Sequence, residues 1–232
     1  MSLLILPQKS RDWLPIARAA LDPDLTAPVD ELLLVRDQAG QRFRPLGPPT
    51  GVVARDGAVL ILLYPDEPDM RLPLTIRSER LPHHRGEVSL PGGATDPDDE
   101  GPLATALREC EEEIGTPANV LSVLGTLSPI YIMPSNFLIT PVVAVCESVP
   151  PMQINPDEVS AVINVTLREL LAPETVVVER RTLRGVEVEV PYFAIAGQKV
   201  WGATALILSE FAARLRQGLL RATPPSEPFH LV

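Results

Sequence analysis

Cysteine is scarce in this chain of 232 residues, which contains only Cys110 and Cys146. Two thiols cannot supply a disulfide-rich scaffold or the ligand set of a structural zinc site. Both lie in apolar patterns, which favours small buried hydrophobic residues. We therefore expect a protein suited to a reducing cytoplasm, with a stability that rests on its hydrophobic core.

Long apolar runs and surplus positive charge are also lacking. No stretch approaches the ~20 residues that a membrane-spanning helix needs. The run from Leu3 to Leu6 is too short for a secretory signal and is followed by Pro7. The 20 Lys and Arg face 30 Asp and Glu, a net charge of −10, so neither nucleic acid nor an acidic membrane is an expected partner. A small phosphorylated substrate stays compatible, because a metal ion or a local basic cluster can supply positive charge.

The hydrophobic fraction of 45% is typical of one globular domain with a sizeable core. An apolar run over residues 57–64 predicts a strand buried on both faces. Alternating or apolar patterns predict further strands over 71–77, 122–127, 138–146 and 159–165, and a hairpin of 176–181 with 186–193. Helices are expected over 10–21, 102–114 and roughly 203–217. Interleaved strands and helices without a clear linker predict an α/β domain of the α+β type with a mixed sheet.

The first 50 residues carry weaker patterns. Residues 31–36 and 42–45, separated by Asp37-Gln38-Ala39-Gly40, predict a second hairpin. We expect an N-terminal extension over 1–50 that packs on the main domain or contributes to a dimer contact. The main domain then covers 51–220, and a loose Pro-rich tail covers 221–232. A homodimer is thus one possible assembly.

The segment 102–114 carries the main chemical signal. Pro102 suits the first position of a helix, and Gly115 suits the residue just past its end. At about 100° per residue, four residues are expected to form a core-facing stripe: Leu103, Leu107, Cys110 and Ile114. Three carboxylates project together on another side: Glu109, Glu112 and Glu113.

Carboxylates spaced at i, i+3 and i+4 repel one another, so a helix selected for stability alone would scatter Lys among them. Mg²⁺ and Mn²⁺ prefer oxygen ligands of this kind, completed by waters and substrate phosphates. Arg108 lies four residues before Glu112 and can orient that carboxylate. A solvated acidic face is the alternative for the bare pattern, and the surrounding sequence decides between the two.

The surrounding residues, Arg108-Glu109-Cys110-x-Glu112-Glu113-x-Gly115, resemble the core of the Nudix box. Glu100 fills the position of the first Glu of that box. Ala94 stands where the pattern has Gly, with Gly93 one place earlier, so the loop is one residue longer. Thr116 replaces the final aliphatic residue.

The extra residue and the segment from Leu74 to Gly93 are similar to the coenzyme A pyrophosphatase subfamily. Pro82 and Leu90 stand in place of its usual Arg and Phe. Three downstream segments also resemble this subfamily: Pro134–Phe137, Asn155-Pro156-x-Glu158 and Trp201–Ala205. The resemblance covers roughly residues 50–215 and implies a Nudix-like mixed β-sheet sandwiched between helices.

The resemblance also implies roles for the carboxylates. Glu109, Glu112 and Glu113 would hold Mg²⁺ or Mn²⁺, with the backbone carbonyl of Ala94 nearby. Glu109 or Glu112 would accept the proton of the attacking water, with Glu158 as a further candidate from outside the helix. Arg108 would orient these groups.

Positive charge gathers ahead of the box in Arg71, Arg77, Arg80, Arg85, His83 and His84. Guanidinium groups bind phosphate oxygens bidentately, so Arg77, Arg80 and Arg85 are candidate substrate-binding residues, and pairing with surface acids is the alternative. Gly92 and Gly93 are expected to let the backbone approach substrate or metal closely.

The substrate implied by the resemblance is coenzyme A or acyl-CoA, cleaved to 3′,5′-ADP and (acyl-)4′-phosphopantetheine. Hydrolysis of ADP-ribose, dinucleotides or nucleoside triphosphates is the alternative within the same superfamily. A non-catalytic nucleotide-binding Nudix domain is a third hypothesis. Such domains usually lose the box carboxylates, whereas Glu109, Glu112 and Glu113 are all present in this chain.

Overall fold

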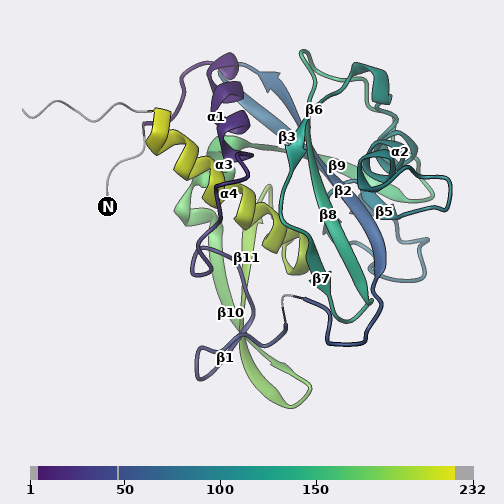
Figure 1. The fold of residues 1–232 in the computed structure, drawn as a ribbon, viewed down its shortest axis with the longest axis vertical. Helices are drawn as coiled ribbons and strands as arrows, with labels where there is room; N and C mark the ends of the chain where they lie inside the picture. The colour runs from purple at the N-terminus through teal and green to yellow at the C-terminus, as the bar shows by residue number, and fades with distance from the viewer. Residues whose placement is uncertain (1–4, 46, 223–232) are drawn as a thin grey trace, which may run out of the picture.

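The computed structural model describes residues 5–45 and 47–222, so most of the predicted loose tail lies outside the described residues. Figure 1 shows a central sheet with α2 (Pro102–Ile114) on one side and α1 (Trp13–Ala20) and α4 (Gly202–Ala222) on the other. Within the described ranges, no helix is long and apolar enough to cross a membrane.

The larger sheet is mixed. It has eight strands in the described part of the chain: β2 (Arg55–Asp66), β3 (Asp69–Arg77), β4 (Val88–Ser89), β5 (Gly92–Ala94), β6 (Ser122–Thr126), β7 (Ile130–Ile132), β8 (Phe137–Val145) and β9 (Val159–Thr166). β2 runs parallel to β8, and the other pairs are antiparallel. The predicted mixed sheet between helices is confirmed.

The sheet opens between β2 and β3. These strands pair only near their connecting turn, where residues 64–66 face residues 69–71. Farther along, β2 pairs with β8 and β5, whereas β3 pairs with β9 and β4. Side chains and backbone from both sides of this opening can therefore meet beside α2, which contacts β2, β5 and β9.

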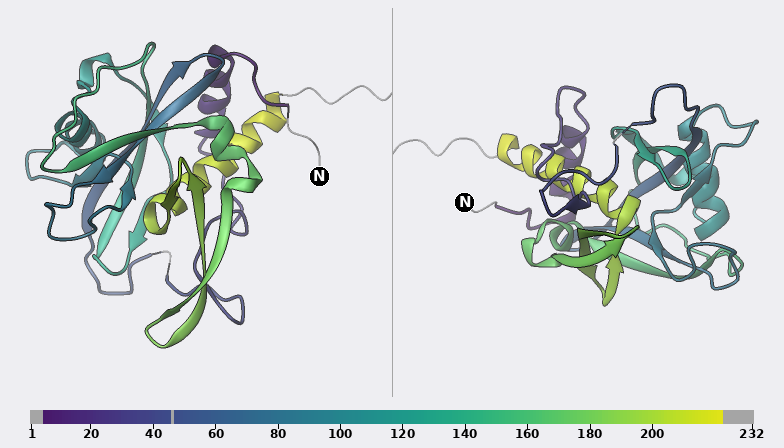
Figure 2. Two further views of the ribbon diagram at one scale, coloured as in Figure 1. Left: turned by 180° about the vertical axis from the view of Figure 1, so that it is seen from behind. Right: turned by 90° about the horizontal axis from the view of Figure 1, so that it is seen from below.

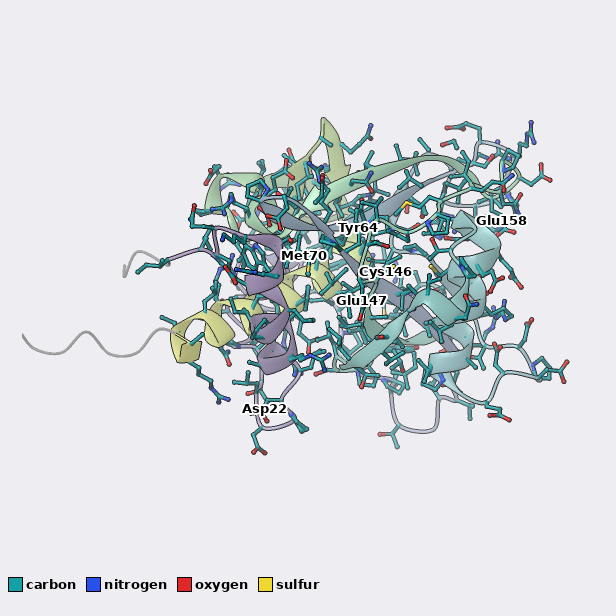
Figure 3. All side chains as sticks on the ribbon, turned by 90° about the horizontal axis from the view of Figure 1, so that it is seen from above. Asp22, Tyr64, Met70, Cys146, Glu147 and Glu158 are labelled. Atoms are coloured by element: carbon teal, nitrogen blue, oxygen red, sulfur yellow. The ribbon has the colours of Figure 1, made fainter. Side chains whose placement is uncertain are left out.

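β2 is buried on both faces, as its apolar run predicts. Leu60 and Leu62 pack against α2, whereas Ile61 and Leu63 belong to the larger core that includes α1 and α4. Successive side chains of a strand point to opposite faces, so one apolar strand can anchor both helical layers. Figure 3 shows Tyr64, from the α2 side of β2, in the interior of the molecule.

A smaller antiparallel sheet contains β1 (Arg36–Asp37), β10 (Val176–Leu183), β11 (Val186–Ile195) and β12 (Gln198–Val200). The hairpin of β10 with β11 is confirmed and projects from the rest of the molecule (Figure 2). Its turn places Arg184 and Gly185 at φ 51° and 78°, the left-handed pair that a two-residue hairpin loop requires.

The hairpin predicted for residues 31–36 with 42–45 is confirmed only around its turn, where the Phe43 N–H donates to the Val35 carbonyl oxygen and the Asp37 N–H donates to that of Gln41, both at 2.9 Å. β1 pairs with β11, with Arg36 beside Glu189, and Arg36 forms only an isolated bridge with Arg42. The Asp37 carboxylate accepts the backbone N–H groups of Ala39 and Gln41, which closes a tight loop. The other strand partner of this segment is β11, which local patterns do not reveal.

Two of the predicted helices differ from their predicted ranges. α4 runs to Ala222 rather than to residue 217, and the predicted helix over 10–21 is a 3₁₀ turn, η1 (Ser10–Asp12), followed by α1. α3 (Leu167–Leu171) was not predicted, although its capping box of Thr166 with Glu169 is a recognisable helix start. Two further 3₁₀ turns are η2 (Ala118–Val120) and η3 (Pro173–Thr175).

Candidate active site

α2 begins and ends where its sequence predicts. Pro102 occupies its first turn, and Gly115 takes the left-handed conformation at φ 69° while its N–H donates to the Glu111 carbonyl oxygen. The predicted core-facing stripe is only partly right, because Leu103 is exposed. The buried face instead contains Thr105, Ala106, Cys110, Glu113 and Ile114.

The rotation of this face follows from the helix N-terminus. The Thr105 hydroxyl donates to the Asp99 carboxylate at 2.9 Å and lies 3.1 Å from the Thr95 hydroxyl. This anchoring turns Thr105 and its neighbour Ala106 toward the sheet in place of Leu103. The same rotation carries the Glu113 carboxylate inward, and Glu113 is only 2% exposed.

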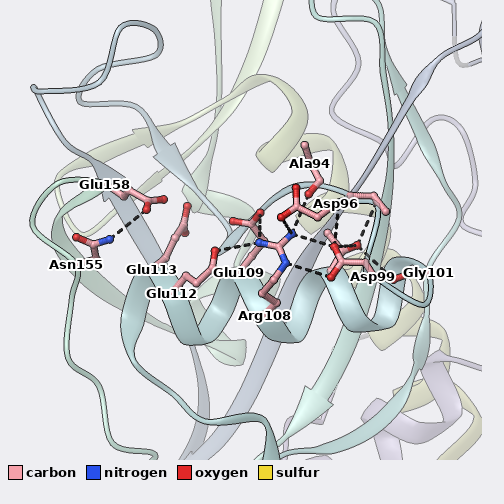
Figure 4. A network of polar contacts seen from close by, with 12 residues as sticks. Ala94, Asp96, Asp99, Gly101, Arg108, Glu109, Glu112, Glu113, Asn155 and Glu158 are labelled. Atoms are coloured by element: carbon pink, nitrogen blue, oxygen red, sulfur yellow. Dashed lines mark hydrogen bonds and ion pairs between the residues drawn. The ribbon is translucent and has the colours of Figure 1, made fainter.

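Three carboxylates meet beside α2. Side-chain oxygens of Glu109, Glu113 and Glu158 all lie within 4.8 Å of one another. The first two come from the helix, and Glu158 comes from the loop before β9, as Figure 4 shows. Glu158 is also labelled beside α2 in Figure 3. The predicted trio of Glu109, Glu112 and Glu113 therefore differs from the observed cluster by one member.

The cluster is electrostatically unfavourable without a cation. Burial raises the pKa of Glu113 to about 8, and the charges of Glu109 and Glu158 act in the same direction, whereas the charge of Arg77 opposes them. Burial also raises the pKa of Glu109, and Arg108 acts against this shift. The Glu113 Oε2 atom is buried without a hydrogen-bond partner, which leaves an oxygen available to a ligand.

The donor set fits a hard divalent cation. Three carboxylate oxygens close together, one of them unpartnered, match the oxygen ligands that such ions prefer. A cation at this position would be held by Glu109, Glu113 and Glu158. It would offset the repulsion that otherwise favours protonation of the buried member.

Glu112 lies outside this cluster. Its side chain is 50% exposed and receives a hydrogen bond from Arg108 at 2.9 Å. The predicted i, i+4 pairing of Arg108 with Glu112 is thus present in the structure.

Arg108 joins the helix to the preceding loop. Its guanidinium donates to both carboxylate oxygens of Asp99, at 3.1 and 3.0 Å, and to the Ala94 carbonyl oxygen at 3.0 Å. It also donates to Glu109 at 3.0 Å. These bonds, drawn in Figure 4, hold the Glu109 carboxylate from the side opposite the cluster's buried oxygen. Arg108 therefore acts by orienting the acidic groups.

The acidic residue of the preceding loop that pairs with Arg108 is Asp99, one place before Glu100. The resemblance places Glu100 at the position of the first Glu, but Asp99 makes the bidentate bond. Asp99 also accepts the backbone N–H of Asp96 at 2.9 Å. Its hydrogen bond with Arg108 is the main cause that lowers the pKa of Asp99. The longer loop shifts the carboxylate by one place, which motif alignment alone does not show.

The loop that supplies Glu158 is fastened to α2. The Asn155 backbone N–H donates to the Glu113 carbonyl oxygen at 2.9 Å, and its side-chain Nδ2 donates to Glu158 at 3.1 Å. The Ser78 backbone N–H donates to the Glu158 carbonyl oxygen at 2.8 Å. Helix periodicity cannot indicate Glu158, because it reaches the cluster from another element.

Gly92 and Gly93 make room for close backbone contacts in β5. A Cβ on Gly93 would overlap the Glu109 carboxylate, and a Cβ on Gly92 would lie 2.6 Å from the Val59 Cα. Ala94, next in the strand, turns its carbonyl oxygen toward Arg108. The two glycines thus let β5 pass directly against both β2 and α2.

Only one of the three candidate arginines reaches the site. The Arg77 guanidinium lies 3.8 Å from the Glu113 carboxylate and lines the adjoining cavity. Arg80 is exposed and pairs with Asp157, and Arg85 is exposed and donates to the Leu81 carbonyl oxygen. Neither Arg80 nor Arg85 lines this cavity.

A cavity of about 490 Å³ adjoins the cluster. Arg77 and Gly92 form its boundary with the carboxylates. Its other walls include two aromatic residues, Phe137 and Trp201, and apolar side chains such as Ile139. The site thus combines a carboxylate cluster, the Arg77 guanidinium beside it and a mainly apolar cavity.

Comparison with known proteins supports a family assignment. The family described as NUDIX domain matches residues 54–185. A Yersinia pestis (strain Pestoides F) relative, named "Uncharacterized Nudix hydrolase NudL", is 35% identical over 161 residues, or 69% of this chain and 80% of the relative. The crystal structure of a Nudix hydrolase from M. smegmatis, RenU, covers 84% of this chain and 98% of that chain, at 20% identity and TM-score 0.47. The NUDIX domain of Shewanella oneidensis NrtR, solved with ADP ribose, covers 54% and 80%, at 21% identity and TM-score 0.41.

Proposed function

The chain belongs to the Nudix family of hydrolases, and from this premise we propose that it hydrolyses the diphosphate linkage of coenzyme A or acyl-CoA. The products are 3′,5′-ADP and 4′-phosphopantetheine or its acyl derivative. Hydrolysis of a pyrophosphate-containing substrate follows from the family. Coenzyme A as that substrate is the specific part of the proposal.

One observation carries the proposal: Arg77, which lines the cavity, lies 3.8 Å from Glu113 of the Glu109, Glu113 and Glu158 cluster. Nudix enzymes generally need a divalent metal cation, and we propose Mg²⁺ or Mn²⁺ at this cluster. When bound, such a cation neutralises charge on the diphosphate and lowers the pKa of a bound water. Arg77 supplies a further positive charge for a phosphate oxygen.

Two tasks are divided among the four carboxylates of the site. Glu113 is buried and has an unpartnered oxygen, so it suits cation binding together with Glu109 and Glu158. Glu112 is half-exposed and lies outside the cluster, so we assign it acceptance of the proton from the attacking water. Arg108 holds Glu109 and Glu112 in place through one hydrogen bond to each.

The cavity supports a substrate with an aromatic base and a long, weakly polar arm. Phe137 and Trp201, each with one ring face stacked by an arginine (Arg55 and Arg181), leave the opposite face for a purine ring. Ile139 offers apolar surface to a pantetheine chain. The similarity of residues 74–93 to the coenzyme A pyrophosphatase signature points the same way. Two free buried thiols, Cys110 and Cys146, suit the reducing cytoplasm in which we propose that the enzyme acts.

Metal-dependent turnover with product identification tests this function. Purified protein with saturating Mg²⁺ or Mn²⁺ is incubated with coenzyme A, acetyl-CoA, ADP-ribose, diadenosine polyphosphates and nucleoside triphosphates. We expect the highest kcat/KM for the two coenzyme A substrates, with 3′,5′-ADP released. A higher value for ADP-ribose or a dinucleotide would refute coenzyme A specificity. The absence of turnover on every substrate would instead support a non-catalytic Nudix domain.

A further inference from the structure

Arg44 reaches the substrate cavity from outside the segment that matches the family. It precedes β2, and its side chain lines the cavity together with Ile132 and Gly202. The same three residues also line an adjoining hollow beside Leu34 and Pro191. Arg44 thus lies between β7 and the start of α4, in the part of the chain before residue 54.

The Arg44 guanidinium lacks an acidic partner. Its Nε atom is buried without a hydrogen-bond partner, and no acidic side chain of residues 5–45 and 47–222 forms an ion pair with it. Burial, followed by the positive charge of Arg184, lowers the pKa of Arg44. In contrast, the partly buried Arg77 has Glu113 at 3.8 Å.

A partly buried cation without a counter-charge is costly, and a second cation nearby increases the cost. Proteins accept such an arrangement where a ligand completes it, because guanidinium groups bind phosphate oxygens through bidentate, charge-assisted hydrogen bonds. The chemistry at Arg44 therefore matches a phosphate monoester.

Arg44 lies at the opposite end of the cavity from the carboxylate cluster. Gly92 of β5 adjoins Gly93, which lies against the cluster residue Glu109, whereas Arg44 and Ile132 of β7 line the same two hollows. β5, β2, β8 and β7 are hydrogen-bonded in this order, and at ~4.8 Å between neighbouring strands the two outer strands lie roughly 14 Å apart. A substrate whose diphosphate sits at the cluster can thus extend across this floor toward Arg44.

We propose that Arg44 binds a phosphate monoester of the substrate that is separate from the diphosphate to be cleaved. This specificity residue comes from the N-terminal extension, so residues before the Nudix domain complete the substrate site. The inference rests on the proposed function for the identity of the substrate. For coenzyme A, the group bound is the 3′-phosphate of the ribose.

Paired substrates test the assignment. Coenzyme A and dephospho-CoA differ only in the 3′-phosphate, so we compare KM and kcat for both in the wild type, Arg44→Gln and Arg44→Lys. We expect Arg44→Gln to raise KM for coenzyme A by ~10-fold or more, as for a lost charged hydrogen bond. The kcat, and the KM for dephospho-CoA, should stay as in the wild type. Arg44→Lys should recover part of the affinity, because it keeps the charge but not the bidentate geometry.

Arg42→Gln is the matched control, because Arg42 is exposed, lies two residues away and does not line the cavity. Its KM values should equal those of the wild type. An equal rise of KM for both substrates in Arg44→Gln would overturn the proposal and indicate a structural role. Unchanged KM values for both substrates in that variant would also overturn it.

A binding measurement separates this inference from the proposed activity. Calorimetry with 3′,5′-ADP and AMP reports the contribution of the 3′-phosphate without any turnover. We expect the wild type to bind 3′,5′-ADP more tightly and Arg44→Gln to lose that preference. If the wild type binds both nucleotides equally, Arg44 is not the phosphate site, even if coenzyme A is hydrolysed. If the preference is found but coenzyme A is not cleaved, the proposed activity fails and the Arg44 site stands.

Discussion

The backbone N–H of Asn155 donates to the carbonyl oxygen of Glu113, with 2.9 Å between the two atoms. This bond joins the loop before β9 to the last turn of α2. The same residue holds the Glu158 side chain through its Nδ2 atom at 3.1 Å. Asn155 thus sets the position of one cluster carboxylate relative to another, although it does not belong to the cluster itself.

Replacement of Asn155 by Ala should weaken metal binding more than it weakens the fold. The backbone bond to Glu113 remains, whereas Glu158 loses the donor that orients it. Loss of such an outer partner typically lowers metal affinity about 10- to 100-fold, which titration of Mn²⁺ into the metal-free protein can measure. Asn119→Ala, at an exposed position in η2, is the control. Equal Mn²⁺ affinity in the wild type and Asn155→Ala would contradict the positioning role.

The stability of the metal-free protein should fall as the pH rises from about 5 to 8.5. The pKa of Glu113 is raised to about 8 from an ordinary value of 4.5, so the folded state binds a proton more tightly than the unfolded state. The unfolding free energy therefore decreases with increasing pH across this interval. Thermal unfolding in EDTA can record this trend, and Glu113→Gln should flatten it. An identical slope in that variant would assign the effect to other groups.

The Asp99 carboxylate, rather than that of Glu100, should support Arg108. Asp99→Asn removes the charge that faces the guanidinium at 3.0 Å, so we expect a lower Tm and a lower kcat, with Glu100→Gln unchanged in both. The pKa of Asp99 is lowered in the folded protein. Its stabilisation is therefore complete above its ordinary pKa of 3.8 and is lost as the pH falls below that value. An Asp99→Asn variant with wild-type kcat would show that Arg108 is held adequately by its other partners.

The adjacent glycines of β5 should respond differently to an added methyl group. In Gly93→Ala the new Cβ meets the flexible end of Glu109, which can move away, so the Tm should hold while metal affinity falls. In Gly92→Ala the Cβ meets the β2 backbone at Ala58 and Val59, which cannot move, so the fold should lose stability. Gly47→Ala is the control, because nothing lies within 4 Å of its Cβ. The reverse order of Tm values would refute this account of β5.

Signals that lie within a single segment of the sequence predicted α2 and β2 correctly. The bounds of α2 follow from Pro102 and Gly115, and β2 follows from its apolar run, since both signals lie within the element itself. The hairpin predicted before residue 46 forms only around its turn, and the other partner of β1 is β11, about 150 residues later in the chain. Strand partners of this kind depend on the assembled sheet and leave no trace in the segment.

The residues of the active site also fall into two groups, those that a local pattern indicates and those that meet only in the folded protein. Helix periodicity places Glu109 and Glu113 on one side of α2, but it also includes Glu112, which the structure leaves half-exposed beside Arg108. Glu158 reaches the cluster through a loop, and Arg44 reaches the cavity from the N-terminal extension. Residues from separate elements meet only after folding, so their spacing in sequence cannot reveal the contact.

The most direct test compares turnover of coenzyme A by Glu113→Gln and by Glu111→Gln at saturating Mn²⁺. Glu111 is exposed, lies in the same helix and lies outside the cluster, so it controls for the loss of one acidic residue from α2. We expect Glu111→Gln to release 3′,5′-ADP at the wild-type rate. Glu113→Gln should lose nearly all turnover while unfolding at a Tm no lower than that of the wild type. Full turnover by Glu113→Gln would contradict the assignment of the carboxylate cluster as the catalytic metal site.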